Sequence, residues 1–220
     1  MNYTEYALIV AGGKGSRIKS IVPKQFLELN GLPVLMHTIE AFYRYSEKIN
    51  IIVVLPQGDF DMWKSLCLKF NFNKPITLQQ GGDSRFQSVK LGLDKITGEG
   101  LVAIHDGVRP LVDEDIIGAS FRLAGVHQSA VAAVRLKESI RIINQDTTAA
   151  MDRSQFRIVQ TPQTFQVALI KKAYEQQEDV SLTDDASVAE RAGLTISLFE
   201  GSMRTLKSQP LKTWLSLPHS

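Results

Sequence analysis

Short apolar runs of strand length alternate along this chain with segments of helical periodicity. The predicted strands are residues 6–11, 51–55, 76–79, 101–104, 130–134 and 194–199, and the predicted helices are 34–47, 59–70, 84–93, 113–123, 167–177 and 183–191. This alternation predicts a doubly wound, mostly parallel α/β sheet. Ligands of such sheets lie beyond the carboxyl ends of the strands. We therefore expect the loops at 12–24, 81–88 and 105–110 to converge on one site.

The composition fits one globular domain spanning residues 1–220, with 44% apolar and 22% charged residues. No apolar run approaches the ~20 residues that span a bilayer. The residues before the first apolar run lack the basic segment of a signal peptide, so we do not expect one. The single cysteine, Cys67, excludes an intramolecular disulfide framework. A net charge of +2 with both signs interspersed is not the pattern of a nucleic-acid groove. We expect a cytoplasmic protein with neither a nucleic-acid nor a membrane partner.

The first apolar run ends at a glycine-rich turn, AGGKGSR, at residues 11–17. Glycine lets the backbone approach a ligand, and successive exposed N–H groups form an anion site. Arg17 and Lys24 add two positive charges nearby. The pattern indicates a polyphosphate site, but its spacing matches neither a Rossmann fingerprint nor a P-loop and leaves an ordinary flexible turn open. The candidate nucleotide-binding residues of the turn are Ala11, Gly12, Gly13 and Gly15.

Two later loops carry further candidates. The backbone at Gly82 could approach a planar base, with Ser88 as a hydrogen-bond partner, although Asp83 or Ser84 could simply cap the following helix. Asp106 follows a buried strand and is well placed to hold Mg²⁺ or a ribose hydroxyl. Its neighbour His105 is expected to be structural, and Arg109 could bind either phosphate or an acidic neighbour.

The pattern changes between residues 135 and 160, where apolar segments 140–143 and 156–159 flank polar, turn-rich sequence. This indicates a β-hairpin arm leaving the main sheet. A two-stranded arm is marginal alone in water, so we predict that it clasps a second subunit in a homodimer. A hairpin folded back on its own domain is the alternative that the pattern leaves open.

Taken together, six motifs resemble the 2-C-methyl-D-erythritol 4-phosphate cytidylyltransferase family over roughly residues 6–204. They are AGGKGSR at 11–17, PKQ at 23–25, GGDSR at 81–85, HDGVRP at 105–110, QTPQ at 160–163 and TDDAS at 183–187. The resemblance implies a Rossmann-like nucleotidyltransferase fold with a dimerisation arm. It also implies an Mg²⁺-dependent enzyme of isoprenoid precursor synthesis that joins CTP to a polyol phosphate and releases pyrophosphate.

The resemblance also implies residue roles. Arg17 and Lys24 would bind the triphosphate and the charge that develops at its α-phosphorus, and Lys207 falls on the family's catalytic lysine. Cytosine would be read by Gly82, Asp83 and Ser88, and Asp106 would lie near the ribose or the metal. Arg153 would reach the polyol phosphate of a partner subunit, and Ser139 stands where the family has threonine. The substrate-binding candidates are Arg109, Ser139, Arg153, Thr183 and Asp184.

The chain departs from the family after about residue 204. Where the family ends similarly to Asn-Ile-Lys-Ile-Thr-Thr-Pro-Glu-Asp, residues 205–213 read TLKSQPLKT. Skipping one nucleotide in suitable family codons yields this sequence, so we interpret the tail as a frameshift product and expect it to be disordered. Two alternatives therefore stay open: a ribitol-5-phosphate cytidylyltransferase, and a CTP-binding dimer whose altered tail impairs turnover.

Overall fold

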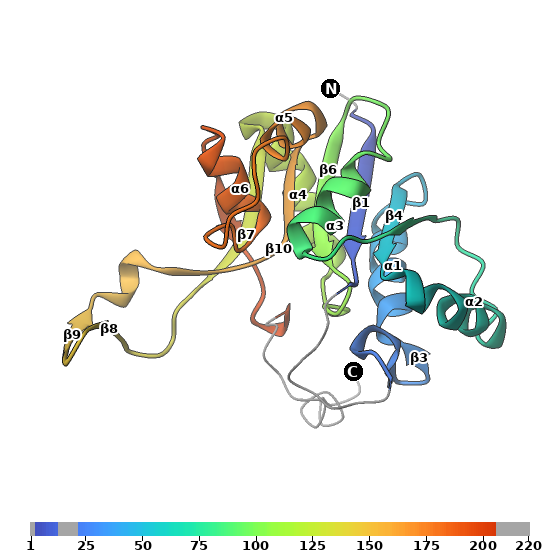
Figure 1. Ribbon diagram of the computed structural model, residues 1–220, viewed down its shortest axis with the longest axis horizontal. Coiled ribbons are helices and arrows are strands. Elements are labelled where there is room, and N and C mark those ends of the chain that lie inside the picture. Colours follow the sequence, from blue (N-terminus) through green and yellow to red (C-terminus); the bar gives the residue numbers. More distant parts are fainter. Residues whose placement is uncertain (1–2, 13–21, 206–220) are drawn as a thin grey trace.

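The computed structural model describes residues 3–12 and 22–205, which form a seven-stranded sheet covered by helices (Figure 1). The strand order is β11-β7-β10-β6-β1-β4-β5. The strands are β1 (Glu5–Val10), β4 (Asn50–Leu55), β5 (Thr77–Gln80), β6 (Leu101–Asp106), β7 (Ser129–Arg135), β10 (Arg157–Gln166) and β11 (Leu198–Glu200). Among these strands, β10 alone runs antiparallel to its neighbours, β6 and β7. The predicted doubly wound, mostly parallel sheet is confirmed.

Helices cover both faces of the sheet. They are α1 (Val34–Tyr45), α2 (Phe60–Lys69), α3 (Arg85–Leu93), α4 (Glu114–His127), α5 (Val167–Ala173) and α6 (Asp185–Arg191). Successive side chains of a strand point to opposite faces, so Ile9 packs in the core that contains α1 and α4, and Leu8 packs in the core that contains α3, α5 and α6. Because both faces are covered, the central strands are nearly continuous apolar runs.

Side-chain caps fix where the helices nearest the carboxyl ends of the strands begin. Ser84 accepts a hydrogen bond from Gln87 N at the start of α3, and Asp113 caps α4 in the same way. Asp184 and Ser187 form a reciprocal capping box at the start of α6. Every helix in the described part of the chain falls short of the length and apolarity needed to cross a membrane.

The arm is a hairpin of β8 (Ile140–Asn144) and β9 (Thr147–Met151) that projects away from the body (Figure 1). The prediction that residues 156–159 form its second strand was wrong. Phe156 closes a short 3₁₀ turn, and residues 157–159 begin β10, which pairs Ile158 with Val134 of β7 and leads back into the main sheet. A short apolar segment carries no information about its partner strand, so the pairing could not be read from the pattern.

The segment after Pro23 contains a 3₁₀ turn, Lys24–Phe26, and a small hairpin. The hairpin strands are β2 (Glu28–Leu29) and β3 (Leu32–Pro33). Asn30 and Gly31 join them with positive φ angles of 49° and 79°. Asn-Gly is a preferred pair for such a two-residue turn, so the sequence did contain the signal.

Candidate active site

The carboxyl ends of the parallel strands meet at one edge of the sheet. The backbone N–H of Ala11 donates to a carbonyl of β4 over 2.9 Å, and that of Gly107 donates to β1 over the same distance. Gly81 N donates to the last residue of β4 over 2.8 Å. The three loops therefore converge where they are described, as predicted. Gly13, Gly15, Arg17 and Lys207 lie outside the described residues.

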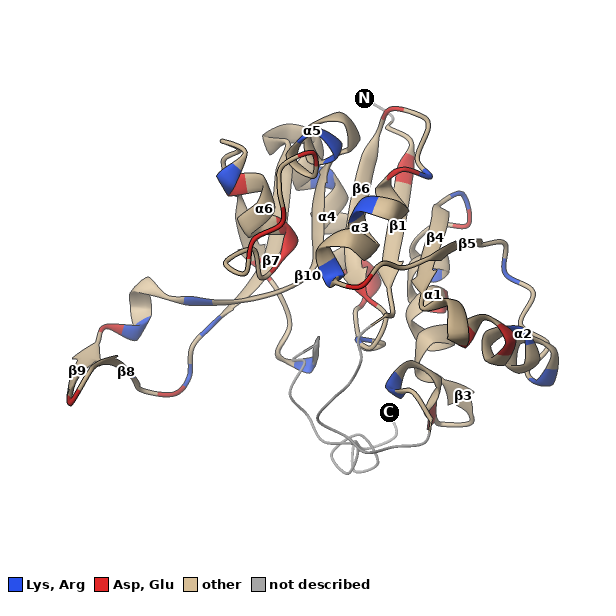
Figure 2. Cartoon of the chain, viewed as in Figure 1, with Lys and Arg blue, Asp and Glu red and all other residues tan. Residues whose placement is uncertain are grey.

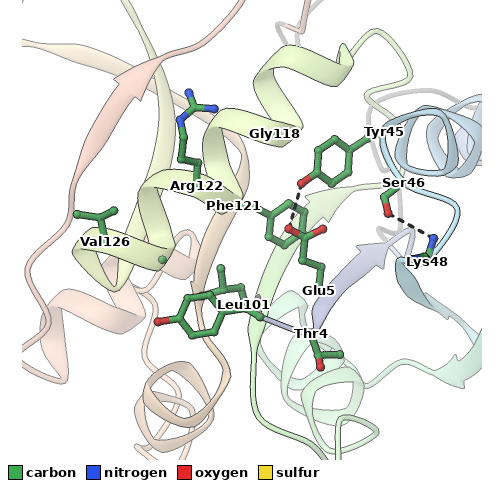
Figure 3. A pocket seen from close by; sticks show the side chains of 12 residues that line it. Thr4, Glu5, Tyr45, Ser46, Lys48, Leu101, Gly118, Phe121, Arg122 and Val126 are labelled. Carbon is green, nitrogen blue, oxygen red and sulfur yellow. Dashed lines mark hydrogen bonds between the residues drawn. The ribbon is translucent and has the colours of Figure 1, made fainter. Parts of the chain in front are cut away.

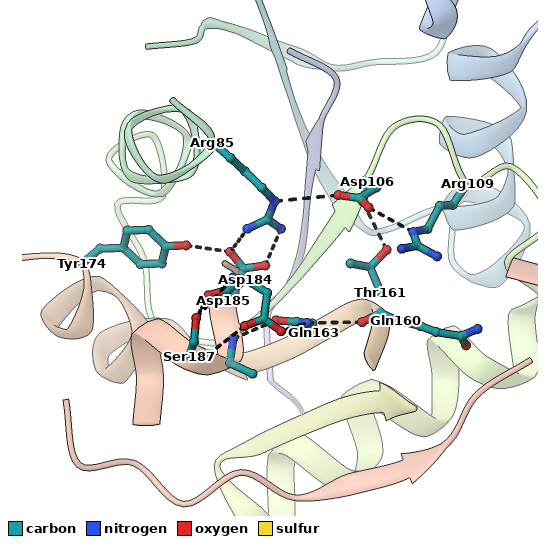
Figure 4. Close-up of polar contacts among 11 residues, drawn as sticks. Arg85, Asp106, Arg109, Gln160, Thr161, Gln163, Tyr174, Asp184, Asp185 and Ser187 are labelled. Atoms are coloured by element: carbon teal, nitrogen blue, oxygen red, sulfur yellow. Dashed lines mark hydrogen bonds and ion pairs between the residues drawn. The ribbon is translucent and has the colours of Figure 1, made fainter. Parts of the chain in front are cut away.

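A cavity of about 270 Å³ opens at this edge, between β6, β10 and the starts of α3 and α6 (Figure 4). It brings together four residues that the sequence singled out: Asp106, Arg109, Thr183 and Asp184. It also contains residues to which sequence reasoning gave no role: Arg85, Val159, Gln160, Thr161 and Gln163.

Asp106 ends β6 and is held by cations on both sides. Its Oδ2 accepts a hydrogen bond from Arg109 Nε at 3.0 Å, and its Oδ1 lies 3.8 Å from Arg85 Nε. Opposite charges this close favour the ionised carboxylate. Of the two expectations for Arg109, the acidic neighbour is the one observed. Figure 2 shows that acidic and basic residues are interspersed over the elements of the described chain, and this trio is a local instance.

Arg85 also forms a forked ion pair with Asp185, the first residue of α6. Its Nη1 and Nη2 donate to the two carboxylate oxygens over 2.8 and 2.6 Å. Burial, the largest single effect, opposes the charge of Arg85, but Asp185, Asp106 and Tyr174 together more than offset it, so the pKa of Arg85 lies above its ordinary value. Tyr174 donates its hydroxyl to Asp185 Oδ1 over 2.6 Å. Burial, followed by the charge of Asp185, raises the pKa of Tyr174.

One glutamine of β10, Gln163, holds the start of α6 in place by hydrogen bonds. Gln163 donates to Asp184 Oδ2 over 2.9 Å and accepts a hydrogen bond from Ala186 N over 2.8 Å. The other oxygen of Asp184 accepts a hydrogen bond from Ser187 N. Asp184 is therefore engaged in holding the helix start, and Thr183 precedes it on the cavity wall.

The turn before α3 is shaped by side chains of that helix. Gly82 N donates to Ser88 Oγ over 3.1 Å, and Asp83 N donates to Gln87 Oε1 over 3.1 Å. A Cβ added at Gly82 would lie 2.5 Å from Gln87 Cβ, so a larger residue there would force the turn or the start of α3 to shift. Of the two capping alternatives, Ser84 is the cap. Asp83 is exposed, whereas Ser88 is buried beneath the turn.

Lys24 is half-buried in a segment anchored to α2 and the turn before it. Its neighbour Gln25 donates to Asp59 Oδ2 over 2.8 Å, and the ring of Phe26 lies 6.3 Å from that of Trp63. These contacts fix the backbone on either side of Gln25 and therefore the position of Lys24. Sequence reasoning missed the anchor, because it depends on a partner 34 positions away.

Ser139 and Arg153 lie on the arm, and neither lines the cavity of its own chain. The guanidinium of Arg153 donates to the carbonyl of Lys137, at the base of the arm. One chain therefore does not bring these two candidates together with the other substrate-binding candidates.

His105 is fully buried beside the site. Its Nε2 lies 3.1 Å from the Arg109 carbonyl oxygen, and its Nδ1 has no partner among the described residues. Burial lowers the pKa of His105 to about 4, and the hydrogen bond to Arg109 opposes this only in part. The ring is neutral at pH 7 and packs edge-on against Phe42, in line with the structural role expected for it.

A larger cavity, of about 1030 Å³, lies at the opposite edge of the sheet (Figure 3). It is lined by residues at the amino ends of β1 and β6, including Glu5, whose carboxylate accepts a hydrogen bond from Tyr45. None of the described candidate residues lines it. Because ligands of this sheet type bind at the carboxyl ends, the smaller cavity is the candidate active site.

Comparisons with known proteins identify the relatives of this chain. A family model for 2-C-methyl-D-erythritol 4-phosphate cytidylyltransferase matches residues 6–211. The chain is 44% identical to the enzyme of that name from Bacteroides fragilis, covering 91% of this chain and 92% of that one. It is also 44% identical to the one from Bacteroides thetaiotaomicron, covering 91% of each.

A solved structure of 4-diphosphocytidyl-2C-methyl-D-erythritol synthase from Anaerococcus prevotii is similar to this chain, with a TM-score of 0.81 at 26% identity. The likeness covers 97% of this chain and 93% of that one. With its fold, its cavity at the carboxyl ends of the strands and its match over most of its length, the chain belongs to the 2-C-methyl-D-erythritol 4-phosphate cytidylyltransferase family.

Proposed function

We propose that this chain transfers the cytidylyl group of CTP to 2-C-methyl-D-erythritol 4-phosphate, giving CDP-methylerythritol and pyrophosphate in isoprenoid precursor synthesis. The observation that carries the proposal is the cavity in which Asp106, Arg109 and Thr183 meet, beside the described part of the glycine-rich turn, in a chain of this family. The comparisons favour this substrate over ribitol 5-phosphate.

In the proposed reaction, a phosphate oxygen of the polyol phosphate attacks the α-phosphorus of CTP. A new P–O bond forms there while the bond to the β-phosphate breaks, and pyrophosphate leaves with that electron pair. The second pKa of a phosphate monoester is about 6, so the nucleophile is a dianion at pH 7 and needs no general base. This agrees with the neutral, buried state of His105.

The main difficulty is to bring this anion close to an anionic triphosphate. Fixed cations solve it by positioning and by electrostatic stabilisation of the transition state. In our proposal, Lys24 and Arg17 bind the triphosphate, and the turn at Gly82 and Ser88 contacts cytosine. Asp106 lies where the end of β6 would place it against the ribose, and Thr183 contacts the polyol.

Mg²⁺ is the proposed cofactor. Among the described residues no group of three or more His, Cys, Asp or Glu side chains could form a metal cage. Asp106 is a single carboxylate already engaged by two arginines. This donor set fits Mg²⁺ in its usual nucleotide mode, in which one or two protein carboxylates bind the ion and phosphate oxygens and water supply its other ligands. When bound, the ion would neutralise charge on the triphosphate.

A homodimer formed through the arm is proposed as the functional state. The arm and the first residues of β10 expose apolar side chains, among them Ile143, which is 74% exposed, together with Ile142, Met151, Phe156 and Ile158. Pairing with a second copy would remove these side chains from water and bring Arg153 toward the other copy's cavity. Sedimentation velocity of the wild type and of Ile143→Asp tests this: a monomeric wild type would contradict it. A cytoplasmic location stays a prediction from composition.

Pyrophosphate release with CTP and Mg²⁺ tests the activity, with 2-C-methyl-D-erythritol 4-phosphate and ribitol 5-phosphate compared as acceptors. We expect release with the first acceptor. Because the tail departs from the family, the same assay is made on a variant whose residues 205–213 are restored to the family sequence. Binding of CTP without release in the unaltered chain alone would identify the impaired dimer. Release only with ribitol 5-phosphate would contradict the proposed substrate.

A further inference from the structure

The guanidinium of Arg85, which lines the cavity, lies between the carboxylate of Asp106 on the cavity wall and that of Asp185, which is buried behind the wall (Figure 4). Its Nη1 and Nη2 atoms hold both oxygens of Asp185, on α6, over 2.8 and 2.6 Å. Its Nε faces Asp106, at the end of β6, over 3.8 Å. Only arginine presents donors in a rigid planar fork that can engage one carboxylate in this bidentate way while facing another.

Asp185 determines where Arg85 can lie. The Asp185 side chain is fully buried, and its second partner is the hydroxyl of Tyr174, over 2.6 Å. Tyr174 is itself buried, and its ring lies 4.7 Å from that of Phe86, the residue after Arg85 on α3. An ionised carboxylate in such a place is unfavourable without a hydrogen-bonded cation. Arg85 is therefore held in one position by groups that do not face the cavity.

The two carboxylates that Arg85 joins come from the two elements that carry the proposed substrate subsites. Asp106 is the proposed ribose or metal contact, and its other oxygen is held by Arg109 over 3.0 Å. Asp185 directly follows Thr183 and Asp184, the proposed polyol contacts, at the capped start of α6. A shift of α6 relative to β6 would therefore have to break the contacts of Arg85.

We propose that Arg85, locked by Asp185 and Tyr174, is a positioning residue that sets the distance and orientation between the nucleotide subsite and the polyol subsite. The inference rests on the proposed function and adds to it a residue cluster that aligns the two reactants. Misplacing reacting groups by about 1 Å can lower a rate by ~10²-fold, which is the size of effect expected when the cluster is broken.

The test uses Arg85→Lys, Asp185→Asn and Tyr174→Phe in the full chain, with Arg44→Lys as the matched control. Arg44 also pairs with a carboxylate, that of Glu114, but both side chains are about half exposed and neither lines the cavity. Pyrophosphate release is measured while the concentration of each substrate is varied in turn. Circular dichroism monitors thermal unfolding of each variant.

We expect Arg85→Lys to raise the KM of both substrates and to lower kcat, with kcat/KM reduced by ~10²-fold at a temperature where the variant is fully folded. Asp185→Asn should do the same to a similar degree. The double variant Arg85→Lys/Asp185→Asn should have a kcat/KM only slightly below that of either single variant, since both substitutions break the same contact. Tyr174→Phe removes one hydroxyl only and should give a smaller change in the same direction.

A merely structural ion pair would give a different result. In that case Arg85→Lys and Tyr174→Phe would unfold at a lower temperature than the wild type. Their kcat and both KM values would match those of Arg44→Lys, and this result would overturn the inference. If Arg85→Lys does not fold, Tyr174→Phe decides by the same criteria. If the wild type releases no pyrophosphate, the proposed function fails by itself. Calorimetric titration with Mg·CTP then tests Arg85: weaker CTP binding in Arg85→Lys supports the inference, and unchanged binding refutes it.

Discussion

The side-chain amide of Gln160 forms two hydrogen bonds with the backbone of Ser202, in the pattern of a paired β-strand. Its Nε2 donates to the Ser202 carbonyl over 2.8 Å, and Ser202 N donates to its Oε1 over 3.1 Å. Gln160 lines the cavity, and Ser202 comes just before the segment in which the sequence departs from its family. The contact therefore fixes the backbone at Ser202, just after β11 ends, next to the candidate site.

Replacing Gln160 by alanine should lower the free energy of unfolding by about 1–3 kcal/mol. The change deletes both hydrogen bonds and leaves polar groups of Ser202 without these partners. Urea denaturation of Gln160→Ala measures the loss, and Gln177→Ala, at an exposed position, is the control. Equal stability of the two variants would show that the contact contributes nothing.

Lys24→Ala should fold normally and lose turnover by ~10²–10³-fold, because it removes one preorganised cation from the proposed triphosphate site. Lys64→Ala is the control, since Lys64 is 69% exposed on α2 and lines no part of the cavity. Pyrophosphate release under saturating CTP and acceptor gives the rates. Arg17→Ala should behave like Lys24→Ala. Full activity of Lys24→Ala would remove this residue from the mechanism.

Gly82→Ala should weaken CTP binding by distorting the turn before α3. The added Cβ would lie 2.5 Å from Gln87 Cβ, closer than carbon atoms approach one another in proteins, so the turn or the helix start must shift. At Gly58 the same addition meets nothing within 4 Å, and Gly58→Ala is the control. Calorimetric titration with Mg·CTP compares them. Equal affinities would indicate that the turn does not contact the nucleotide.

The buried His105 should make the fold sensitive to mild acid. In the unfolded chain the imidazole takes up a proton near pH 6.5, whereas in the folded chain burial holds its pKa at about 4. Protons thus bind the unfolded state preferentially in this interval. The stability present above pH 6.5 is lost as the pH falls toward 4, by at most about 1.4 kcal/mol per pH unit.

Urea denaturation between pH 4 and pH 7.5 measures this slope. His105→Gln, which cannot take up the proton, should flatten it, whereas His127→Gln, at an exposed position, should leave it as in the wild type. Parallel pH profiles for the wild type and His105→Gln would contradict the assignment.

The sequence was sufficient for the central parallel strands, because buried parallel strands such as β1 and β6 are continuous apolar runs that few other structures tolerate. It placed the edge strand β11 at 194–199, whereas the strand is Leu198–Glu200. It was insufficient for β10. The buried positions of that strand include Gln160, Thr161, Gln163 and Thr164, which are polar and give no hydrophobic period. They are stable in the core because each has a specific partner, such as the Ser120 hydroxyl for Thr164.

The candidate site likewise contains residues that the sequence could locate and contacts that it could not predict. Loop residues at the carboxyl ends of strands, including Asp106 and Thr183, could be located from the alternation and the motifs. The ion pair between Arg85 and Asp185 could not, although both residues lie in those motifs. They are 100 positions apart, and a charged residue in a sequence does not indicate which opposite charge it will meet.

The central claim is that the carboxyl-end cavity binds CTP in reach of the polyol phosphate. A crystal structure of the chain with Mg²⁺ and the non-reacting α,β-methylene analogue of CTP tests it most directly. The account predicts cytosine against the turn at Gly82 and Ser88, the ribose beside Asp106, and the triphosphate toward the glycine-rich turn and Lys24. A nucleotide bound elsewhere, for example in the larger cavity beside Glu5 and Tyr45, with this edge of the sheet empty, would contradict it.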